Sequence, residues 1–369
     1  MKVLHIITDT NIGGAGKVLC ALLENIDREN FDVSVALPYG SELTLLIERT
    51  GTRTIPTFYG RDKSFERGAV GELKKIIRRE RPDVVHTHAS LSGRIAARLC
   101  GVPVRIMTRH CVFEQKAGNT KFPKKQLRGC FSDMLTTGYI ATALAAKRQL
   151  VEEGCGEKKI TVIQNGASRP RDVSSGERTA LREKLGIPEG AFVVGIFARL
   201  EPYKGHRYLI DAMSKMKVNN IYLLIVGDGS ERRALEEYAG EKALSDRVIF
   251  TGFREDTAPY YAITDVGANA SVGVEATSLA IIEAMSLGIP SVVSDSGGNP
   301  DTVSDGYDGI VVPQKDGDAI AEAILSLYQD REKLKALGDG ARESYEKKYS
   351  SLIMTKKTEE LYRSFTKRS

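Results

Sequence analysis

Short apolar runs alternate with amphipathic stretches along the whole chain of 369 residues. In the first half, the apolar runs are rich in β-branched residues, and stretches with helical spacing separate them. The predicted strands are residues 3–7, 33–37, 84–88, 104–107, 139–141 and 160–163. The predicted helices between them include residues 16–25, 68–79, 90–100 and 143–152. This alternation predicts an α/β domain whose parallel strands are joined by crossover helices.

The alternation stops at residues 167–176, where turn formers replace the apolar pattern, so this segment is predicted as a linker. It then restarts. The second set of predicted strands is residues 193–198, 222–226, 248–250, 266–268 and 289–293. Helical stretches follow at residues 318–328, 331–348 and 351–365. We therefore predict two doubly wound parallel-sheet domains, 1–170 and 171–350, and a terminal helix within 351–369.

The length and the amino-acid composition of the chain are typical of a protein with two domains of ordinary size. The chain has no apolar run of 18 residues, so no transmembrane helix is predicted. Its first residues lack the basic and apolar regions of a signal peptide. The five cysteines are scattered and have no Cys-x-x-Cys spacing, which indicates reduced thiols in a cytosolic protein rather than disulfides or a zinc site.

Two cations follow the strand predicted at residues 193–198. Arg199 stands at its carboxyl end, and Lys204 stands at the start of the next helix. In open α/β sheets, ligands bind at this edge, and a helix start adds free backbone N–H groups. Arg and Lys together can neutralise a diphosphate, although a surface ion pair with Glu201 is the alternative.

Two glutamates, Glu275 and Glu283, lie on either side of the apolar run at residues 279–282. On one continuous helix they would be rotated by about 80° and separated by about 12 Å, so they could not bind one small ligand from one face. We predict instead that Glu275 lies on a loop and Glu283 in the early turns of the next helix, beside one crevice. Two solvated surface glutamates are the alternative.

Taken in order, the motifs of the chain resemble those of the retaining glycosyltransferases of the GT-B type, and within them family four, the glycosyl transferases group 1. The resemblance covers nearly the whole chain. The motifs are Gly13-Gly14-Ala15, Asp83-Val-Val-His86-Thr-His88, Asn165-Gly166, Arg199 with Lys204-Gly205, Gly227-Asp228-Gly229, Glu275 with Glu283, and Gly297-Gly298.

This resemblance implies two Rossmann-like domains that face each other across a cleft, with the last helix crossing back to the first domain. It implies a retaining transfer of a sugar from a nucleotide-sugar donor, UDP- or GDP-linked, to a glycan or lipid-linked acceptor. The expected setting is cell-surface polysaccharide or glycolipid biosynthesis.

The resemblance also assigns roles to residues. Glu283 would accept hydrogen bonds from the ribose, and Glu275 would contact the transferred sugar as a catalytic residue. Arg199 and Lys204 would clamp the diphosphate without a metal ion. We therefore expect no cofactor, with the nucleotide sugar as a substrate.

In the first domain, the loop with Gly13 and Gly14 would face the donor phosphates. It lacks the full glycine pattern of NAD-binding loops, and no acidic residue follows the second strand. Similar enzymes often have a glutamate where this chain has Gly16, a departure expected to be minor. Residues 276–278 also depart, because Gly and an aromatic, often followed by Pro or Gly, are usual after the first glutamate in similar enzymes. This departure leaves the identity of the donor sugar open.

Three histidines lie at or just past the ends of strands predicted in the first domain. His86 and His88 flank Thr87 and point the same way, as a metal pair would, but no third ligand is evident, so a structural or substrate-lining role is predicted. His110 matches a histidine near the reacting sugar in similar enzymes, and we assign it as catalytic, with a core or capping role as the alternative. Neutral imidazole can hydrogen-bond a sugar hydroxyl.

One Asp-x-Asp sequence, Asp316-Gly-Asp318, resembles the metal-binding motif of other glycosyltransferases. It precedes a helical pattern, where an acidic residue is an ordinary cap, so we predict a cap and no metal site.

Charge is unevenly distributed. Residues 1–170 hold 27 Lys plus Arg against 17 Asp plus Glu, a net charge of +10, and the remainder has a net charge of −5. The basic stretches 74–81 and 121–128 favour an anionic membrane surface, although a solvated helix face is the alternative for the first. No nucleic-acid module is present. We expect a cytoplasmic protein, peripheral on the inner face of the cell membrane.

Three other functions are alternatives. A glycosidase uses two carboxylates but would not need Arg199 and Lys204. A sugar-nucleotide 2-epimerase of the same fold, and a nonenzymatic GT-B-like binding subunit, both remain open at this point.

Overall fold

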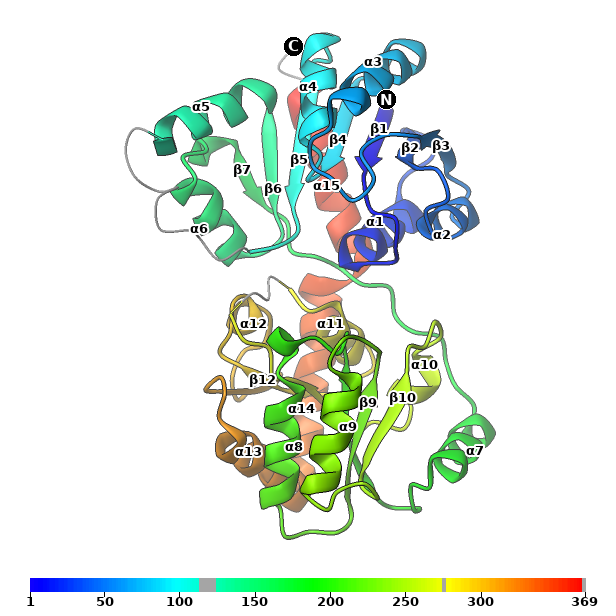
Figure 1. The fold of residues 1–369 in the computed structure, drawn as a ribbon, viewed down its shortest axis with the longest axis vertical. Coiled ribbons are helices and arrows are strands. Elements are labelled where there is room, and N and C mark those ends of the chain that lie inside the picture. Colours follow the sequence, from blue (N-terminus) through cyan, green and yellow to red (C-terminus); the bar gives the residue numbers. More distant parts are fainter. Residues whose placement is uncertain (113–123, 274–276, 367–369) are drawn as a thin grey trace. The chain divides into compact units, whose positions relative to one another are not determined.

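The structure is a computed structural model, and it describes residues 1–112, 124–273 and 277–366. The chain divides into two compact units. Unit 1 comprises Met1–Ala167 together with Ser351–Ser369, and unit 2 is Ser168–Ser350. Each unit is a parallel sheet with helices on its faces (Figure 1). The predicted fold class, two doubly wound α/β domains, is confirmed.

Unit 1 has a seven-stranded sheet in the order β3-β2-β1-β4-β5-β6-β7. Its strands are β1 (Lys2–Ile7), β2 (Asp32–Pro38), β3 (Arg53–Thr57), β4 (Val84–His88), β5 (Val104–Arg109), β6 (Gly138–Ala141) and β7 (Ile160–Val162). Its helices are α1 (Gly14–Asn25), α2 (Leu43–Arg49), α3 (Arg67–Glu80), α4 (Leu91–Leu99), α5 (Lys124–Leu135), α6 (Leu144–Glu152), the short η1 (Glu157–Lys159) and α15 (Ser351–Thr366).

Unit 2 has a six-stranded sheet in the order β10-β9-β8-β11-β12-β13. Its strands are β8 (Phe192–Phe197), β9 (Ile221–Val226), β10 (Val248–Gly252), β11 (Val266–Asn269), β12 (Ser291–Ser294) and β13 (Gly309–Val312). Its helices are α7 (Ser175–Leu185), η2 (Pro202–Lys204), α8 (His206–Lys215), α9 (Arg232–Glu241), α10 (Ala258–Tyr261), α11 (Leu279–Ser286), α12 (Asn299–Thr302), α13 (Gly317–Gln329), α14 (Arg331–Ser344) and η3 (Tyr345–Tyr349).

The core of each unit consists of apolar strand residues packed against one face of each covering helix. Strands such as β8 and β9 are buried along nearly their whole length because helices cover both faces of the sheet. Fully buried strands of this kind read in the sequence as continuous apolar runs, which is why most of them were predicted.

The terminal helix α15 belongs to unit 1, where it packs beside α1 (Figure 1). Its Glu359 accepts a hydrogen bond from the backbone N–H of Asp27 at 2.8 Å. Its Tyr362 is fully buried, and the hydroxyl lies 2.6 Å from His86 Nδ1. These contacts attach the last helix to the same sheet that carries the histidines described below.

Several elements differ from the sequence-based expectation. The edge strands β3 and β13 and the helix α5 were not predicted. Part of the predicted linker is helical, because Ser174 caps α7 in a capping box with Glu177. None of the described helices is long and apolar enough to cross a bilayer.

Candidate functional site

The order of strands in unit 2 reverses between β8 and β11. These strands are neighbours in the sheet, yet about seventy residues separate them along the chain. At such a reversal the loops that follow the two strands diverge to opposite faces and leave a crevice at the carboxyl edge. Arg199 follows β8 by two residues, and Glu283 lies in α11, the first helix after β11.

The loop after β8 is attached directly to the end of β11. The backbone N–H of Val272 donates to the carbonyl oxygen of Tyr203 at 2.8 Å. Gly205 has a left-handed φ of 70°, and a Cβ placed there would lie 1.9 Å from the carbonyl oxygen of Ala270. Only glycine satisfies both conditions, because a side chain would be strained and would clash with backbone. The adjacent Lys204 is therefore held beside the end of β11.

Both predicted cations lie next to Tyr203. Arg199 is exposed in unit 2, and its Nη2 donates to the Tyr203 hydroxyl at 2.9 Å. The Nζ atom of Lys204 lies 5.5 Å from the centre of the Tyr203 ring. Lys204 is the last residue of η2, two positions before α8 begins. The sequence thus placed both residues correctly along the chain, and the structure gathers them around one aromatic ring.

Glu283 is part-buried on α11, and a tyrosine orients it. The Tyr261 hydroxyl donates to Glu283 Oε2 at 2.8 Å. Burial first, and then the Glu283 charge, raises the pKa of Tyr261 well above its ordinary value, so the phenol stays protonated and donates. The described residues donate no hydrogen bond to the other oxygen, Oε1. One carboxylate oxygen is therefore held in place by Tyr261.

The Tyr261 ring also connects Glu283 to β8. It stacks on Phe197, the last residue of that strand, with the ring centres 3.7 Å apart. Phe197 precedes Arg199 by two residues. The Tyr261 ring therefore connects Glu283 to the end of the strand that Arg199 follows. Tyr261 was not among the predicted site residues. Its position just before β11 offered only a weak signal in the sequence.

The predicted catalytic Glu275 lies outside the described residues, as does Ala276. The first described residues after this gap are Thr277 and then Ser278, which precedes α11 as its N-cap.

Polar side chains that were not predicted also join the loops at this edge. Ser294 Oγ donates to the carbonyl oxygen of Ser271 at 2.6 Å, and the backbone N–H of Ser271 donates to Asn269 Oδ1 at 3.0 Å. The fully buried Asn299 donates to the carbonyl oxygen of Ser294 at 3.1 Å. These bonds connect β11, β12 and α12, so the backbone around the crevice is well supported.

Unit 1 has the same topological reversal between β1 and β4. Gly13 caps α1, and its carbonyl oxygen accepts from the backbone N–H of Lys17 at 3.0 Å. A Cβ placed at Gly14 would have no heavy atom within 4 Å, so the protein's own packing does not require a glycine there. At Gly16, in contrast, a Cβ would lie 2.3 Å from Leu43 Cδ2. Gly16 is therefore needed for the packing of α1 against α2.

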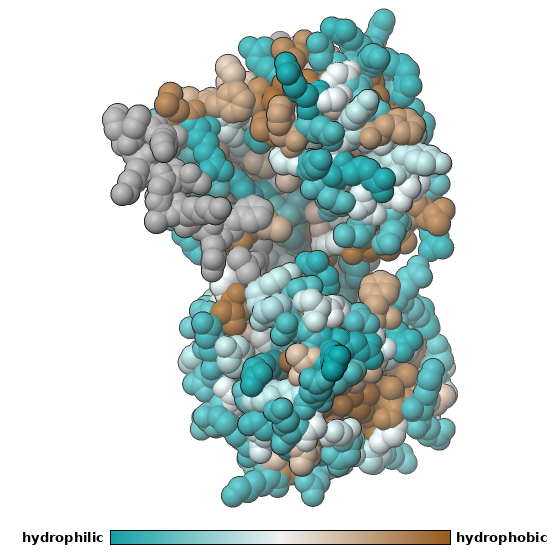
Figure 2. All heavy atoms as spheres, in the orientation of Figure 1, coloured by the Kyte–Doolittle hydropathy of each residue, from teal (hydrophilic) through white to brown (hydrophobic). Residues whose placement is uncertain are grey.

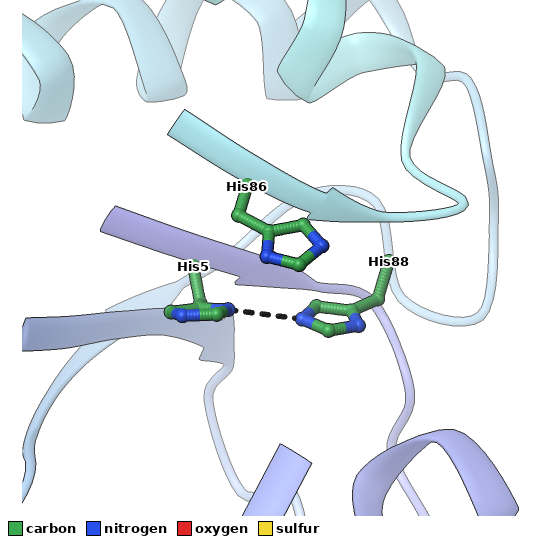
Figure 3. A group of neighbouring side chains, drawn as sticks. All are labelled: His5, His86 and His88. Atoms are coloured by element: carbon green, nitrogen blue, oxygen red, sulfur yellow. Dashed lines mark hydrogen bonds between the residues drawn. The ribbon is translucent and has the colours of Figure 1, made fainter. Parts of the chain in front are cut away.

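Four histidines gather at the carboxyl edge of this sheet. His86 and His88 lie on β4, as predicted, and His110 follows β5. The fourth, His5, was not predicted, and it is the register partner of His86 on β1. His5 Nδ1 lies 3.0 Å from His88 Nε2 (Figure 3), and His88 Nδ1 lies 2.8 Å from His110 Nε2.

Burial keeps these rings uncharged. It lowers the pKa of His5 from 6.5 to about 3 and that of His110 to about 4. The pKa values of His86 and His88 are also well below the ordinary value, first because of burial and then because of the neighbouring rings. Since a buried charge without a partner is costly, the cluster is neutral near pH 7.

His5, His86 and His88 are the group of described residues that comes closest to a metal site, since their ligand atoms all lie within 4.8 Å of one another. The expectation that no third ligand accompanies His86 and His88 was wrong. However, the rings of His5 and His88 stack at 19°, and those of His86 and His88 at 21° (Figure 3). Near-parallel rings direct their lone pairs along separate planes. Both nitrogens of His86 already meet hydroxyls, of Tyr362 and Thr108. The arrangement fits hydrogen bonding better than coordination.

A small pocket adjoins the histidines, with a cavity volume of about 20 Å³, and it is partly open to solvent. His86, His88 and His110 line it together with apolar side chains of α1 and α15. The Nδ1 atom of His110 has no hydrogen-bond partner among the described residues.

The Asp-x-Asp sequence is a helix cap, as predicted. Asp316 is the N-cap of α13, and its Oδ1 accepts from the backbone N–H groups of Asp318 and Ala319 at 3.0 Å.

The histidines predict a loss of stability in acid. Below pH 6.5 the unfolded chain binds protons at His5, His86 and His88, whereas in the folded chain burial lowers the pKa of all three well below this value, that of His5 to about 3. Their contribution is complete above pH 6.5 and decreases as the pH falls through this window. We expect the free energy of unfolding to drop by up to about 1.4 kcal/mol per pH unit for each such histidine. Urea unfolding at pH 7.5, 6.0 and 5.0 measures this slope.

The matched variant is His5→Asn, which removes one of the three groups. It should be less stable at pH 7.5 but show a shallower dependence on pH. An unchanged slope, or a wild-type protein that gains stability in acid, would contradict the assignment of neutral buried rings.

Comparison with known proteins places this geometry in a family. The model described as Glycosyltransferase Family 4 matches residues 12–169, and the model described as Glycosyl transferases group 1 matches residues 177–344. A UDP-Gal:alpha-D-GlcNAc-diphosphoundecaprenol alpha-1,3-galactosyltransferase of Escherichia coli is 30% identical over 346 residues, which cover 90% of this chain and 89% of that protein.

Two further proteins are similar over the full length. The capsular polysaccharide biosynthesis glycosyltransferase CapM of Staphylococcus aureus is 26% identical, over 100% of this chain and 98% of its own. The crystal structure of Anabaena HepE in complex with UDP shares the fold, with a TM-score of 0.85, 22% identity, and coverage of 99% of this chain and 100% of its own. The resemblance seen in the motifs is confirmed: the chain belongs to the glycosyl transferases group 1 and is a glycosyltransferase.

Proposed function

We propose that this enzyme transfers a hexose, with retention of configuration, from a nucleotide-sugar donor to a glycan or lipid-linked acceptor of cell-surface polysaccharide or glycolipid biosynthesis. The observation that carries the proposal is the set of groups at the strand reversal of unit 2. Two cations, Arg199 and Lys204, lie there beside Tyr203, and the carboxylate of Glu283 is oriented by Tyr261. This set suits a ligand that has both a diphosphate and hydroxyl groups.

Each group has a chemical task in the proposed reaction. Arg199 and Lys204 bind the diphosphate and stabilise the charge that develops on it as the glycosidic bond breaks. Glu283 accepts hydrogen bonds from the ribose hydroxyls through Oε1, while Tyr261 holds Oε2. Glu275, outside the described residues, contacts hydroxyls of the transferred sugar. No metal ion is required, since the cations serve the leaving group.

Unit 1 provides uncharged groups in this proposal. The backbone at Gly13 and Gly14 can approach the donor phosphates closely, since no side chain is present there and the space above Gly14 is open. His110 forms a hydrogen bond to the transferred sugar. Its pKa of about 4 means that it acts as a neutral ring at physiological pH.

We favour a UDP-linked hexose and a diphosphate-lipid-linked acceptor. The E. coli relative is named for transfer of galactose from UDP-Gal to a diphosphoundecaprenol-linked sugar, and the HepE structure contains UDP. The experiment is to incubate the protein with UDP- and GDP-hexoses, membrane extract and either Mg²⁺ or EDTA, and to identify the products by mass spectrometry. The anomeric configuration of the product is read by NMR.

The proposal predicts an extended acceptor and free UDP, with equal rates in EDTA and in Mg²⁺. A sugar nucleotide epimerised without any acceptor would identify a 2-epimerase instead. No affinity for UDP or GDP in calorimetry would identify a nonenzymatic binding subunit. Activity only with the metal would refute the role given to Arg199 and Lys204.

Replacing Lys204 by Ala should lower kcat about 100-fold or more, as expected when one preorganised electrostatic group is lost from the transition state. The matched control is Lys217→Ala. Lys217 is an exposed lysine of the same unit, and it precedes β9 at the opposite edge of the sheet. Steady-state kinetics of both folded variants provide the comparison. A Lys204→Ala enzyme with turnover equal to that of Lys217→Ala would remove the clamp from the mechanism.

Replacing Tyr261 by Phe should weaken UDP binding about tenfold, because a hydrogen bond to a charged group is worth roughly 1.5–3 kcal/mol and here it orients the carboxylate that meets the ribose. The control is Tyr260→Phe, since the Tyr260 hydroxyl makes no hydrogen bond with the described residues. Isothermal titration with UDP measures both. Equal affinities for the two variants would mean that Tyr261 does not orient the ligand-binding group.

We also propose that unit 1 binds an anionic membrane surface. On α5, Leu127, Phe131 and Met134 are spaced by four and three residues, so they form one apolar stripe, and they are 68%, 46% and 53% exposed. Figure 2 shows hydrophobic surface over this helix. Arg78 and Arg79, exposed on α3, add positive charge to the unit.

The double variant Leu127→Glu with Phe131→Glu should lose binding to vesicles that contain anionic lipid, because it places two carboxylates on the stripe. Leu45→Glu is the matched control, since Leu45 is 67% exposed on α2 of the same unit. Vesicle flotation with anionic and with zwitterionic lipid measures binding. Equal flotation of the double variant and the wild type, or an equal loss in the control, would exclude α5 as the membrane contact.

A further inference from the structure

His5, His88 and His110 form a continuous chain of hydrogen bonds through unit 1. Each bond joins the Nδ1 of one ring to the Nε2 of the next, at 3.0 Å between His5 and His88 and at 2.8 Å between His88 and His110. The chain therefore has two ends, His5 Nε2 and His110 Nδ1. Both atoms are buried and have no partner among the described residues. The His5 end is enclosed in the core, where the ring is 0% exposed, and the His110 end belongs to a residue that lines the pocket.

Because the three rings are neutral, their protons can be arranged in only two ways that keep both hydrogen bonds. Each ring carries one proton, so each hydrogen bond needs one donor and one acceptor nitrogen. If His5 donates from Nδ1, His88 must accept at Nε2 and donate from Nδ1, and His110 must accept at Nε2 and carry its proton on Nδ1. If His5 accepts at Nδ1, every ring carries its proton on Nε2 instead. Any other pattern breaks one of the two bonds.

The surroundings of the two ends distinguish the two patterns. Each pattern leaves one N–H group without a partner among the described residues, His110 Nδ1–H in the first and His5 Nε2–H in the second. Buried N–H groups without a partner are rare, while under-satisfied acceptors are better tolerated. His5 is fully enclosed, whereas His110 is part-exposed and lines the pocket, where water or a ligand can accept from its N–H group, so the first pattern is the more stable one.

We propose that His5 and His88 are positioning residues that hold His110 in the tautomer with its proton on Nδ1, so that His110 offers a hydrogen-bond donor to a ligand oxygen. In this form His110 cannot act as a general base through Nδ1. The catalytic consequence depends on the proposed function, in which His110 contacts the transferred sugar. The tautomer itself does not depend on it.

His86 supports this arrangement without being part of the chain. Its ring centre lies 4.8 Å from that of His5 and 4.7 Å from that of His88 (Figure 3). Its two nitrogens meet the hydroxyls of Tyr362 and Thr108, each at 2.6 Å. His86 thus packs against the rings of His5 and His88 but exchanges no hydrogen bond with them. It is therefore the matched control position.

The test is NMR of the full-length protein labelled with ¹⁵N-histidine, at neutral pH and without donor. We expect His110 to show a protonated Nδ1 and an unprotonated Nε2, with scalar coupling between His88 Nδ1 and His110 Nε2. His88→Gln retains an amide N–H that can donate to His110 Nε2, so it should preserve the tautomer. His88→Leu removes the donor, and His110 should become a mixture of tautomers. His86→Gln should leave the His110 signals in the wild-type pattern.

Activity gives the second readout. His88→Leu should lower kcat about 10-fold to 100-fold with little change in KM, as partners that fix a histidine tautomer do in other sites, and His88→Gln should restore most of it. Should the enzyme prove to have another function, the NMR pattern still decides the tautomer.

Three results would overturn the proposal. One is an unprotonated Nδ1 of His110 in the wild type, which needs no variant to fold. Another is a change of the His110 tautomer in His86→Gln as large as that in His88→Leu, which would indicate packing alone. The third is stoichiometric binding of Co²⁺ that shifts the ring signals of His5, His86 and His88 together, which would identify a metal site.

Discussion

The carboxyl edge of a parallel sheet gathers residues that are distant along the chain, and both units depend on this constraint. Where the strand order reverses, the two central strands send their connections to opposite faces, so the loops separate and leave space between them. In unit 2 the bond from Val272 to Tyr203 and the contact of Gly205 with Ala270 fix the two loops against each other. In unit 1 the register of β1 with β4 places His5 beside His86. Without the parallel register, neither group of side chains would be brought together.

The two units carry polar groups of different character, and burial explains the difference. The histidines of unit 1 are enclosed by the sheet, α1 and α15, and a charge there would lack both water and a partner. They are consequently neutral and suited to directional hydrogen bonding. In unit 2 Arg199 is exposed and Glu283 is part-buried, so neither is enclosed as the histidines are. The Tyr261 phenol is enclosed there, and it remains protonated as the donor to Glu283.

Local signals in the sequence were enough for part of this picture. Buried strands read as continuous apolar runs, and a cation directly after such a run must lie at the carboxyl edge, so the positions of Arg199 and Lys204 followed from the pattern. The edge strand β3 contains Pro56 and polar residues, which are typical of edges and conceal a strand from an apolar search. Ser174, which forms a capping box with Glu177, lies within the predicted linker 167–176, where neighbouring turn formers conceal the start of α7.

Other features depended on pairings that no local pattern contains. His5 meets His86 only through the register of β1 with β4, across about eighty residues of sequence. Tyr261 meets Glu283 because α10 leads into β11 while α11 leaves it, a relation between two helices on either side of one strand. A single sequence gives the residue types at these positions but not the partner of each.

Two glycines of the first loop, Gly14 and Gly16, differ in whether the packing of the protein leaves room for a side chain. Gly16 is required by the fold, because a Cβ there would overlap Leu43 of α2. A larger side chain at this position would require the buried Leu43 side chain of α2 to shift, so the departure at Gly16 is coupled to the packing of a neighbouring helix. Gly14 has no such constraint, and the space above it is open. The proposed approach of the donor phosphates to the backbone would use this open space.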